Sequence, residues 1–436
     1  MIASESCSLH FSTLDSNLLL NLNFIVKSIL VQPPQKPIRA EIKLAASKSE
    51  CNRALIINAL TDFQCELSNV SEARDSQTML RLLASEDFEA DVIDAGTTMR
   101  FLTALFSVTN QKKRMTGTPR MCERPIGILV DALRILGADI EYQKVEGYPP
   151  LLLNGFDYSG KNELNIRGNV SSQYISALLL IAPALPAGLT IQLEGEVGSR
   201  PYIEMTLNQM ATFGIEYKAN WETNTITIPP SRYTPGPYDI ESDWSGASYW
   251  YSIVALAEDA EVELLGLKKD SLQGDSEIAK IMSHLGVEST FTEGGVILKK
   301  IPAAASIGWD FTNCPDLAQT VAVCCALKNI PLSMTGIESL KIKETDRVFA
   351  LQQELHKLGA ELREIETNHL YKVSQIAGFP QDKTPSIHTY DDHRMAMAFA
   401  PVGMIHPIII EEPEVVVKSY PGYWKDLAKV TTWEEV

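Results

Sequence analysis

Nine positively charged side chains stand beside short polar stretches, most of which precede an apolar run. They are Lys48, Arg53, Arg100, Arg124, Arg200, Lys343, Arg347, Arg394 and Lys418. The whole chain carries a formal net charge of -17, so cations gathered at such positions run against its average composition. If the fold brings them to one cleft, they form a site for at least two multiply charged anions.

Two carboxylates stand among these cations and are candidates for moving protons. Asp316 follows Asn313-Cys-Pro, and Glu344 lies within Lys343-Glu-Thr-Asp-Arg. A positioned carboxylate can accept or donate a proton in a transition state. The sequence shows no Ser-His-Asp order, no metal triad and no dinucleotide glycine fingerprint. The residues alone therefore indicate transfer between two small anionic substrates, without a metal or a nucleotide.

Each motif taken singly also has an ordinary structural explanation. Asp316 could simply cap a helix, Ser171-Ser-Gln is a common cap, and a charged run such as 343–347 is most often a solvated face. Their recurrence along the chain is what favours a site.

The polar stretches predict six helix starts. They are Ser47-Lys-Ser, Gly96-Thr-Thr, Ser171-Ser-Gln, Ser242-Asp-Trp-Ser, Asn313-Cys-Pro-Asp and Asp391-Asp-His-Arg. A helix start offers free N–H groups and partial positive charge to an anion. Most of the runs that follow are nearly all apolar, which predicts buried helices.

Within 94–106 we expect Gly96 to let a bound group approach the backbone and Thr97 or Thr98 to cap the helix. Arg100 is expected to serve structure or the long-range field more than contact. Elsewhere, Arg124-Pro is expected to begin a helix with Pro at its first position, and Lys418 to follow the end of a strand.

An internal repeat organises these helices. A helix that ends in Leu-Gly or Phe-Gly, followed by a strand, recurs with its glycines at 137, 214, 286 and 359, in steps of 77, 72 and 73 residues. Each glycine is expected to be a helix C-cap. With partial copies at 79–84 and 424–430, the chain holds about six units. They group into two three-unit domains, and a cleft between the domains would collect the helix starts.

Composition limits the classes of function. The acidic net charge argues against a nucleic-acid partner, and no apolar run reaches membrane-spanning length. Seven cysteines without a Cys-x-x-Cys pair suit a reducing cytosol. Residues 1–29 lack the basic region of a signal peptide, so we interpret them as an extension with some strand character.

These motifs, in this order, resemble the enolpyruvyl-shikimate-phosphate synthases (3-phosphoshikimate 1-carboxyvinyltransferases), from about residue 30 to the C-terminus. The resemblance is carried by Ser47-Lys-Ser, Asn52-Arg, Ala95-Gly-Thr, Pro119-Arg-Met, Glu123-Arg-Pro-Ile-Gly, Val170-Ser-Ser-Gln, Lys343-Glu-Thr-Asp-Arg and Asp392-His-Arg-Met-Ala-Met. It implies an α/β (α+β) fold of two similar domains, each of three βαβαββ repeat units with buried parallel helices, an inside-out α/β barrel. One domain would span 44–242 and the other 1–43 plus 243–436, with the active site in the cleft between them.

The resemblance also implies a reaction and its place. The enolpyruvyl (carboxyvinyl) group of phosphoenolpyruvate would pass to the 5-hydroxyl of shikimate 3-phosphate by addition–elimination, with release of phosphate, in the shikimate pathway to chorismate and aromatic amino acids. Such a transferase is expected in the cytoplasm, as a monomer with these small-molecule substrates, without cofactor or metal and without nucleic-acid or membrane partners.

Site residues carried over from the family fall into three groups. Shikimate 3-phosphate would be held by Lys48, Ser49, Arg53, Ser171, Ser172, Gln173, Ser199, Tyr202, Asp316, Ser339 and Lys343. Phosphoenolpyruvate would be held by Lys48, Gly96, Arg124, Gln173, Arg347, His393, Arg394 and Lys418. The catalytic hypothesis is that Asp316 takes the hydroxyl proton and Glu344 handles the methylene proton, with Lys48 assisting.

Three positions depart from the family pattern. The family often has Asn at Asp94, Pro at Phe101 and Asn at Ser339. Asp94 would weaken anion binding unless Arg124 or Lys48 compensates its charge. Gly96, in place of Ala, leaves room for a phosphoenolpyruvate mimic such as glyphosate, so we expect inhibition, although Phe101 could shift the helix.

Other functions remain as alternatives. The related enolpyruvyl transferases that act on a UDP-sugar carry a loop Cys five residues before Arg-Pro, where this chain has Pro119. A catalytically inactive anion-binding or scaffold protein would be expected to lose Asp316, Glu344 or Lys48, and this chain has all three. A larger shikimate-pathway polypeptide is disfavoured because 436 residues leave no room for a second enzyme.

Overall fold

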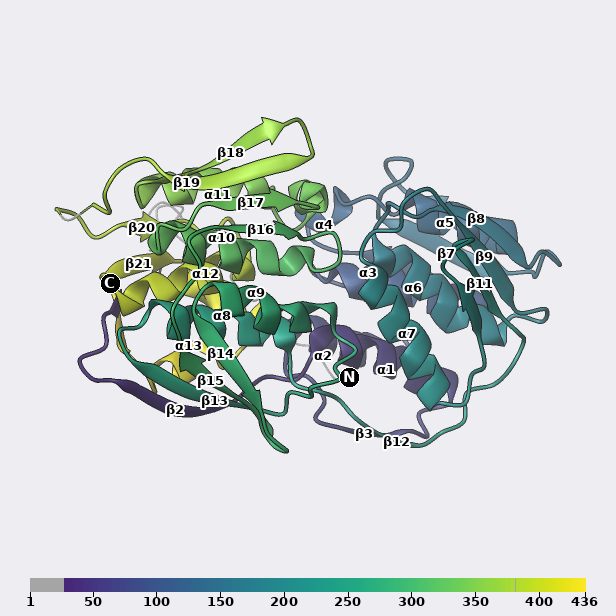
Figure 1. The fold of residues 1–436 in the computed structure, drawn as a ribbon. Coiled ribbons are helices and arrows are strands. Elements are labelled where there is room, and N and C mark those ends of the chain that lie inside the picture. The colour runs from purple at the N-terminus through teal and green to yellow at the C-terminus, as the bar shows by residue number, and fades with distance from the viewer. Residues whose placement is uncertain (1–26, 381) are drawn as a thin grey trace, which may run out of the picture.

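The computed structural model of the chain describes residues 27–380 and 382–436. Its buried apolar side chains form two separate clusters. One draws on residues between 46 and 240, and we call the part of the chain around it the inserted lobe. The other draws on residues 29–44 and 244–430, and we call its surroundings the discontinuous lobe. Figure 1 shows the two lobes side by side, with the inserted lobe on the right.

Three buried helices form the centre of each lobe. In the inserted lobe these are α1 (Lys48–Leu60), α3 (Gly96–Val108) and α6 (Ser172–Ile181), which contact one another. In the discontinuous lobe they are α8 (Trp244–Leu256), α10 (Ala318–Leu327) and α12 (His393–Phe399), again in mutual contact. Nearly all residues of α3, α6, α8, α10 and α12 are buried, as expected for helices that are apolar on all sides.

Five four-stranded sheets share one topology. Each has a parallel pair at one edge, and its remaining neighbours are antiparallel. In the inserted lobe, the strands of one sheet follow the order β4 (Glu89–Asp91), β5 (Lys113–Thr116), β7 (Leu151–Phe156), β6 (Ala138–Tyr142). Those of the second sheet follow the order β8 (Glu163–Arg167), β9 (Leu189–Glu194), β11 (Thr225–Ile228), β10 (Lys218–Asn220). The discontinuous lobe has β2 (Ile38–Lys43), β13 (Ala260–Leu265), β15 (Gly295–Lys300), β14 (Val287–Phe291); β16 (Ile307–Asp310), β17 (Leu332–Thr335), β19 (Leu370–Gln375), β18 (Ala360–Glu366); and β20 (Ser386–Ile387), β21 (Ile408–Glu411), β1 (Ser28–Gln32), β22 (Thr432–Glu435).

A sixth sheet is shorter than the others. Within the described chain it consists of β3 (Glu66–Ser68) and β12 (Pro237–Asp239), a parallel pair without the antiparallel strands of the other five. The predicted α/β repeat fold is thus confirmed, with one reduced unit in the inserted lobe. The other helices are α2 (Arg74–Leu83), α4 (Pro119–Cys122), α5 (Gly127–Leu136), α7 (Arg200–Thr212), α9 (Ile278–His284), α11 (Arg347–Lys357) and α13 (Tyr423–Leu427), with 3₁₀ turns η1 (Ala182–Ala184), η2 (Gly274–Glu277), η3 (Pro315–Leu317), η4 (Glu338–Ile342), η5 (Ala400–Met404) and η6 (Pro413–Lys418).

The four repeat glycines end helices as predicted. Gly137, Gly214, Gly286 and Gly359 follow α5, α7, α9 and α11 with φ of 115°, 81°, 96° and 76°. Only glycine adopts such angles without strain, and at Gly137 an added Cβ would overlap the carbonyl oxygen of Asp157. Each is followed by the first strand of a β-hairpin, so the glycine sets where helix gives way to sheet.

The chain crosses between the lobes twice, and the two crossings lie side by side. Ala46 and Ser242 form an isolated antiparallel bridge. The Ser47 amide donates to the Glu241 carbonyl at 2.8 Å, and the Asp243 amide donates to the Ala45 carbonyl at 2.8 Å. These crossings lead directly into α1 and α8, so they fix the starts of two buried helices next to each other.

Two local predictions were wrong. The helix expected to start at Pro125 begins at Gly127, with Ile126 as its cap residue, so Pro125 lies outside it. In this part of the chain, the proline at the first position of a helix is Pro119 in α4. Lys418 ends the 3₁₀ turn η6 and not a strand, although the preceding valines favour one.

The predicted N-terminal extension lies mostly outside the described residues. Within the described ranges, every helix is too short or too polar to traverse a lipid bilayer.

Candidate active site

The predicted helix starts carry side-chain caps at four of six places. Ser47, Ser171, Asp243 and Asp392 accept hydrogen bonds from backbone amides in the first turns of α1, α6, α8 and α12. The α10 helix is instead preceded by the 3₁₀ turn η3, which contains Asp316.

The start of α3 differs from the prediction. The cap position is Ala95, and neither threonine caps the helix. Thr98 donates its hydroxyl to the Asp75 carbonyl at 3.1 Å, and the Thr97 hydroxyl oxygen accepts from the Gln173 amide at 3.1 Å. Both threonines therefore tie α3 to neighbouring helices and leave the first amides of α3 without a side-chain cap.

Asp316 sits where three cations of the discontinuous lobe converge. Its oxygens lie 2.7 Å from Arg394, 3.0 Å from Arg347 and 3.7 Å from Lys343. Burial alone would raise the pKa of this carboxyl, but these three cations hold it well below its ordinary value. Asp316 is therefore ionised at neutral pH, and it becomes a stronger base only when bound anions draw the charge of these cations away from it.

Glu344 faces the other lobe. It pairs with Arg347 at 2.8 Å and with Arg124 of the inserted lobe at 3.7 Å. Burial would raise its pKa, yet Arg347, Arg124 and Lys418 hold the pKa of Glu344 well below its usual range. The structure thus brings both predicted proton movers into one cluster of cations.

A second group of charges joins the lobes near Lys48 and Lys418. Asp75 lies 3.0 Å from Lys48 and 3.4 Å from Lys418. Asp94 lies 2.7 Å from Lys418 and 2.8 Å from Arg74. The ion-pair partners of Asp94 are therefore Arg74 and Lys418, and not Arg124 or Lys48 as expected.

Two buried arginines in the inserted lobe are held by the protein itself. Arg53 donates to Thr206, Ser176 and the carbonyls of Ser49 and Tyr202, at 2.7–3.2 Å. Arg100 donates to the carbonyls of Gly96 and Pro125 at 3.0 and 2.9 Å, so it orders the backbone around the start of α3. Burial lowers the pKa of each to about 10, and nearby Arg124 contributes to the lowering at Arg100.

Other predicted residues lie around this cluster with different surroundings. Ser172 is buried, whereas Ser171 and Ser339 are exposed. Ser199 adopts a left-handed conformation, and its amide donates to the Thr312 carbonyl of the other lobe at 3.1 Å. Arg200 does not join the cluster: it pairs with Glu204 on its own helix at 2.8 Å and lies over a tryptophan ring.

His393 is fully enclosed at the start of α12. Neither ring nitrogen hydrogen-bonds to a described protein atom. Burial, followed by the charges of Lys48 and Arg394, lowers the pKa of His393 well below its ordinary value. The ring is therefore neutral, with one donor and one acceptor available.

Asp275, which belongs to none of the sequence motifs, also lies at the site. The Tyr202 hydroxyl donates to its Oδ1 at 3.2 Å, and the Ser245 hydroxyl donates to its Oδ2. Arg394 donates to the Ser245 hydroxyl at 3.4 Å and to Asp316 at 2.7 Å, so Asp275 is linked to the cation cluster through Ser245. Asp75 lies in the first turn of α2 and Asp275 in the 3₁₀ turn η2, and neither belongs to a recognised motif, so no sequence signal marked either.

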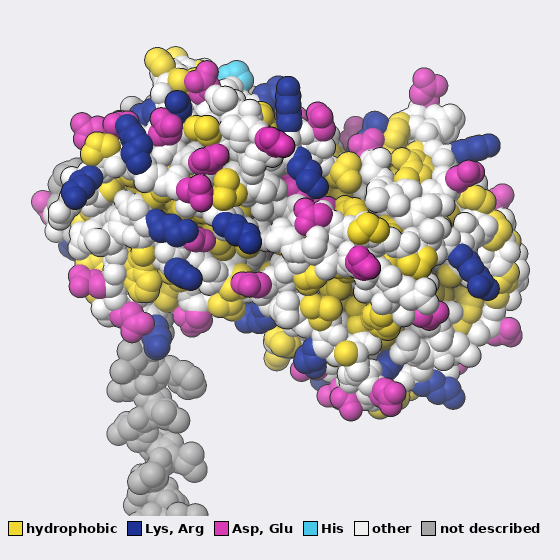
Figure 2. Space-filling view, turned by 90° about the horizontal axis from the view of Figure 1, so that it is seen from below, with side chains coloured by type: hydrophobic (Ala, Val, Ile, Leu, Met, Phe, Trp, Pro, Cys, Tyr) yellow, Lys and Arg dark blue, Asp and Glu magenta, His cyan; other side chains and the backbone are white. Residues whose placement is uncertain are grey.

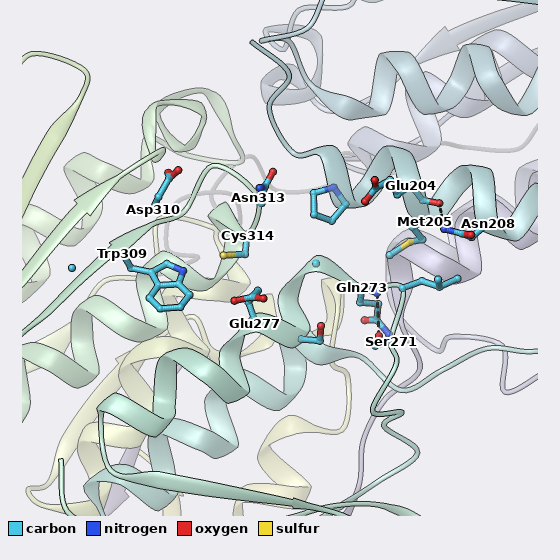
Figure 3. Close-up of a pocket in the computed structure, with 15 residues that line it drawn as sticks. Glu204, Met205, Asn208, Ser271, Gln273, Glu277, Trp309, Asp310, Asn313 and Cys314 are labelled. Carbon is cyan, nitrogen blue, oxygen red and sulfur yellow. Dashed lines mark hydrogen bonds between the residues drawn. The ribbon is translucent and has the colours of Figure 1, made fainter. Parts of the chain in front are cut away.

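A cavity of about 650 Å³ lies beside this region, between α7 and the discontinuous lobe. Figure 3 shows Glu204, Met205 and Asn208 on one side of it and Asn313 and Trp309 on the other. None of the predicted site residues lines it. Its mixed lining carries no cluster of cations, so it is distinct from the anion site.

The surface and the donor sets limit the kind of ligand. Figure 2 shows both signs of charge interspersed over one face of the two lobes, without a continuous basic patch on that face. Among residues 27–380 and 382–436, no three His, Cys, Asp or Glu side chains are grouped as metal ligands would be.

Comparison with known proteins gives consistent matches. The family model of EPSP synthase (3-phosphoshikimate 1-carboxyvinyltransferase) matches residues 32–85 and 84–427. A 3-phosphoshikimate 1-carboxyvinyltransferase of Bacteroides fragilis (strain YCH46) is 49% identical over 407 residues, which cover 93% of this chain and 98% of that protein. The enzyme of the same name from Salmonella heidelberg (strain SL476) is 35% identical over 435 residues, covering 93% and 100%.

A solved EPSP synthase structure from Acinetobacter baumannii superposes with a TM-score of 0.72 at 20% sequence identity, covering 94% of this chain and 100% of that one. At that identity the likeness supports the fold alone. The family model and the relatives cover nearly the whole described chain, including every cation of the cluster, and the chain therefore belongs to the EPSP synthase family.

Proposed function

We propose that this chain is a transferase that moves the enolpyruvyl group of phosphoenolpyruvate to the 5-hydroxyl of shikimate 3-phosphate and releases phosphate. This is the step of the shikimate pathway that leads to chorismate and aromatic amino acids. The observation that carries the proposal is the pair of ionised carboxylates, Asp316 and Glu344, held among cations of both lobes.

Both anionic substrates bind to the cluster, and Lys48 and Gln173 contact both of them. Shikimate 3-phosphate is held by Lys48, Ser49, Arg53, Ser171, Ser172, Gln173, Ser199, Tyr202, Asp316, Ser339 and Lys343. Phosphoenolpyruvate is held by Lys48, Gly96, Arg124, Gln173, Arg347, His393, Arg394 and Lys418. The contacts of Lys48, Arg347, Arg394 and Lys418 with carboxylates support their assignment as anion ligands, because a phosphate can replace a carboxylate as their partner. The cations then fix both substrates in one orientation, which removes much of the entropic barrier to reaction.

The first chemical step is an addition. Asp316, ionised beside Arg394, accepts the proton of the 5-hydroxyl while the oxygen attacks C2 of phosphoenolpyruvate. The methylene carbon takes a proton from Glu344, assisted by Lys48. Glu344 is ionised beside Arg347 and Arg124, so it becomes a donor only when bound substrate anions neutralise those cations and raise its pKa.

The second step is an elimination. The carbon–oxygen bond to phosphate breaks, the methyl carbon returns a proton to Glu344, and the double bond re-forms. The proton taken by Asp316 leaves with the released phosphate or to solvent. Closure of the lobes around the intermediate excludes water from this step.

The domain division and the setting of the enzyme belong to the same proposal. The domains are 44–242 and 1–43 plus 243–436, and the two separate apolar clusters support a division near these bounds, although Leu44 packs in the cluster of the discontinuous lobe. The enzyme acts in the cytoplasm as a monomer, and the proposal includes no cofactor, metal, nucleic-acid or membrane partner.

The test is release of inorganic phosphate from phosphoenolpyruvate with two alternative acceptors. We expect turnover with shikimate 3-phosphate and none with UDP-N-acetylglucosamine. Turnover with the UDP-sugar would favour the related transferase, and release with neither acceptor would favour an inactive binding protein.

The same assay tests the two carboxylates. Asp316→Ala and Glu344→Ala are each expected to lower kcat by about 10²- to 10⁴-fold, the usual contribution of general acid–base catalysis. Asp259→Asn is the matched control, because Asp259 pairs with Arg39 on the exposed surface. Wild-type turnover in either alanine variant would contradict the assignment of that residue.

A further inference from the structure

Asp94 places a carboxylate directly on a cation of the proposed phosphoenolpyruvate site. Lys418 Nζ donates to Asp94 Oδ2 at 2.7 Å and to the Asp94 carbonyl at 3.0 Å. Lys418 comes from the discontinuous lobe and Asp94 from the inserted lobe, immediately before α3. The side chain of Lys418 is only 1% exposed, so an incoming anion must share this cation with Asp94.

The local balance of charge depends on this one carboxylate. Three cations, Lys48, Lys418 and Arg74, face two carboxylates, Asp75 and Asp94, through direct ion pairs. Counted over these direct ion pairs, the group carries a single positive charge, and the carboxyl groups of Glu344 and Asp391 act on Lys418 from farther away. Removing the charge of Asp94 would double the net positive charge of this group without removing a cation.

Asp94 keeps its charge in this position. Burial would raise its pKa, but Lys418 and Arg74 lower it below the ordinary value. Its Oδ1 is buried without a hydrogen-bond partner among the described protein atoms. The carboxylate is thus an ionised group with one oxygen unsatisfied, held at the edge of an anion site.

We propose that Asp94 is an affinity-setting residue: a resident anion that lowers the affinity of the Lys418 side of the site for phosphoenolpyruvate and for the released phosphate. It takes no part in proton transfer. The inference rests on the proposed function, because it assigns Lys418 to phosphoenolpyruvate. A fixed carboxylate beside Lys418 repels a multiply charged anion at close range and, as a result, weakens its binding and speeds its release.

A purely structural role for the Asp94–Lys418 pair makes the opposite prediction. If Asp94 only held Lys418 in place or latched the lobes, its loss would weaken substrate binding. Asparagine separates the two roles, since it keeps an acceptor oxygen for Lys418, and the Asp94 carbonyl contact remains, while the charge is lost.

The experiment compares wild type with Asp94→Asn. We expect the KM for phosphoenolpyruvate and the inhibition constant of inorganic phosphate to fall together by about three- to thirtyfold at low salt, with the difference shrinking as ionic strength rises. The KM for shikimate 3-phosphate should change by no more than about twofold, since only Lys48 among its proposed charged ligands belongs to this charge group, and Lys48 pairs with Asp75 and not with Asp94. Asp259→Asn, which removes an exposed ion-pair carboxylate, should leave all three constants unchanged. A KM for phosphoenolpyruvate that is unchanged or raised in Asp94→Asn would overturn the proposal.

A second variant guards against a folding defect. Arg74→Gln leaves Asp94 with Lys418 as its one cationic partner, so it should raise the KM for phosphoenolpyruvate; a fall there would also overturn the proposal. Calorimetric titration with inorganic phosphate separates this inference from the proposed function. If wild type does not turn over but Asp94→Asn still binds phosphate more tightly, the function proposal fails and the role of Asp94 as a resident anion stands.

Discussion

Asp275 shows how a buried carboxylate can act on a site without belonging to its charge cluster. It accepts hydrogen bonds from Tyr202 of the inserted lobe and from Ser245. The Ser245 hydroxyl oxygen in turn accepts a hydrogen bond from Arg394. Burial, with the nearby Asp316 charge, raises the pKa of Asp275 to about 6. This one carboxyl therefore changes charge in the pH range where the protein is handled.

We expect this shift to appear in stability. An unfolded Asp titrates near ~3.9, so the folded protein holds the Asp275 proton more tightly, and the stability this provides is present below about pH 4 and lost as pH rises through about 6. Asp275→Asn cannot titrate. Its free energy of unfolding, relative to wild type, should rise by about 2 kcal/mol between about pH 4.5 and 7.5. Urea unfolding at several pH values measures this, and a difference that does not vary with pH would refute it.

At the same scale, the cations of the site were predictable and their partners were not. Lys48, Arg347 and Arg394 lie in motifs whose residue types mark an anion site. Asp75 and Asp275 lie in no motif, and only the packing of helices distant in sequence brings them to the cations. Arg200, predicted for the cleft, instead finds a partner one helical turn away.

The start of α3 is the element on which the inhibitor prediction depends. Gly96 lies where an added Cβ would come within 2.8 Å of guanidinium nitrogens of Arg100 and Arg124. Arg100 also donates to the Gly96 carbonyl, so its guanidinium packs against the backbone there. Phe101, which departs from the family pattern, is buried in the helix body and continues it without a break.

We therefore expect the enzyme to be inhibited by glyphosate competitively with phosphoenolpyruvate. Gly96→Ala should weaken this inhibition and raise the KM for phosphoenolpyruvate, because the methyl group displaces Arg124 from the anion. The displaced groups are ends of flexible side chains, so the melting temperature should change little. Inhibition constants from steady-state assays decide this, and full wild-type activity in millimolar-scale glyphosate would contradict it.

Secondary-structure elements were predictable where one residue type determines the backbone conformation. The four repeat glycines located four helix ends because their φ angles are positive. The prediction failed at Lys418, where valines that favour a strand lie in a 3₁₀ turn closed by packing against α12. It failed also at Thr97 and Thr98, whose hydroxyls bond to other helices instead of their own.

At the scale of the molecule, the proposed shikimate 3-phosphate ligands come from both lobes. Arg53 and Ser172 belong to the inserted lobe, whereas Asp316 and Lys343 belong to the discontinuous lobe. A ligand that binds both is expected to favour the closed arrangement, since it gains contacts only when the lobes approach.

Small-angle scattering tests this expectation. Shikimate 3-phosphate should lower the radius of gyration of the wild-type protein, while an equal concentration of inorganic phosphate should have a smaller effect. Lys343→Ala removes one ligand of the discontinuous lobe and should require a higher concentration for the same compaction. An unchanged radius at saturating shikimate 3-phosphate would count against closure by that ligand.

The paired crossings at Ala46 and Ser242 have a consequence for the gene as well as for the protein. The chain leaves one lobe and returns to it at adjacent points, joined by the hydrogen bonds of residues 45–47 with 241–243. A segment with neighbouring ends can be inserted into a host domain, or removed from it, with little disturbance of the host. Both lobes repeat the same βαβαββ unit. The arrangement is therefore the one expected when a coding segment is duplicated and one copy is inserted into the other. The insertion site then lies between the end of β2 and the start of α8, and a short linker that joins these two elements directly would be the natural way to separate the two lobes.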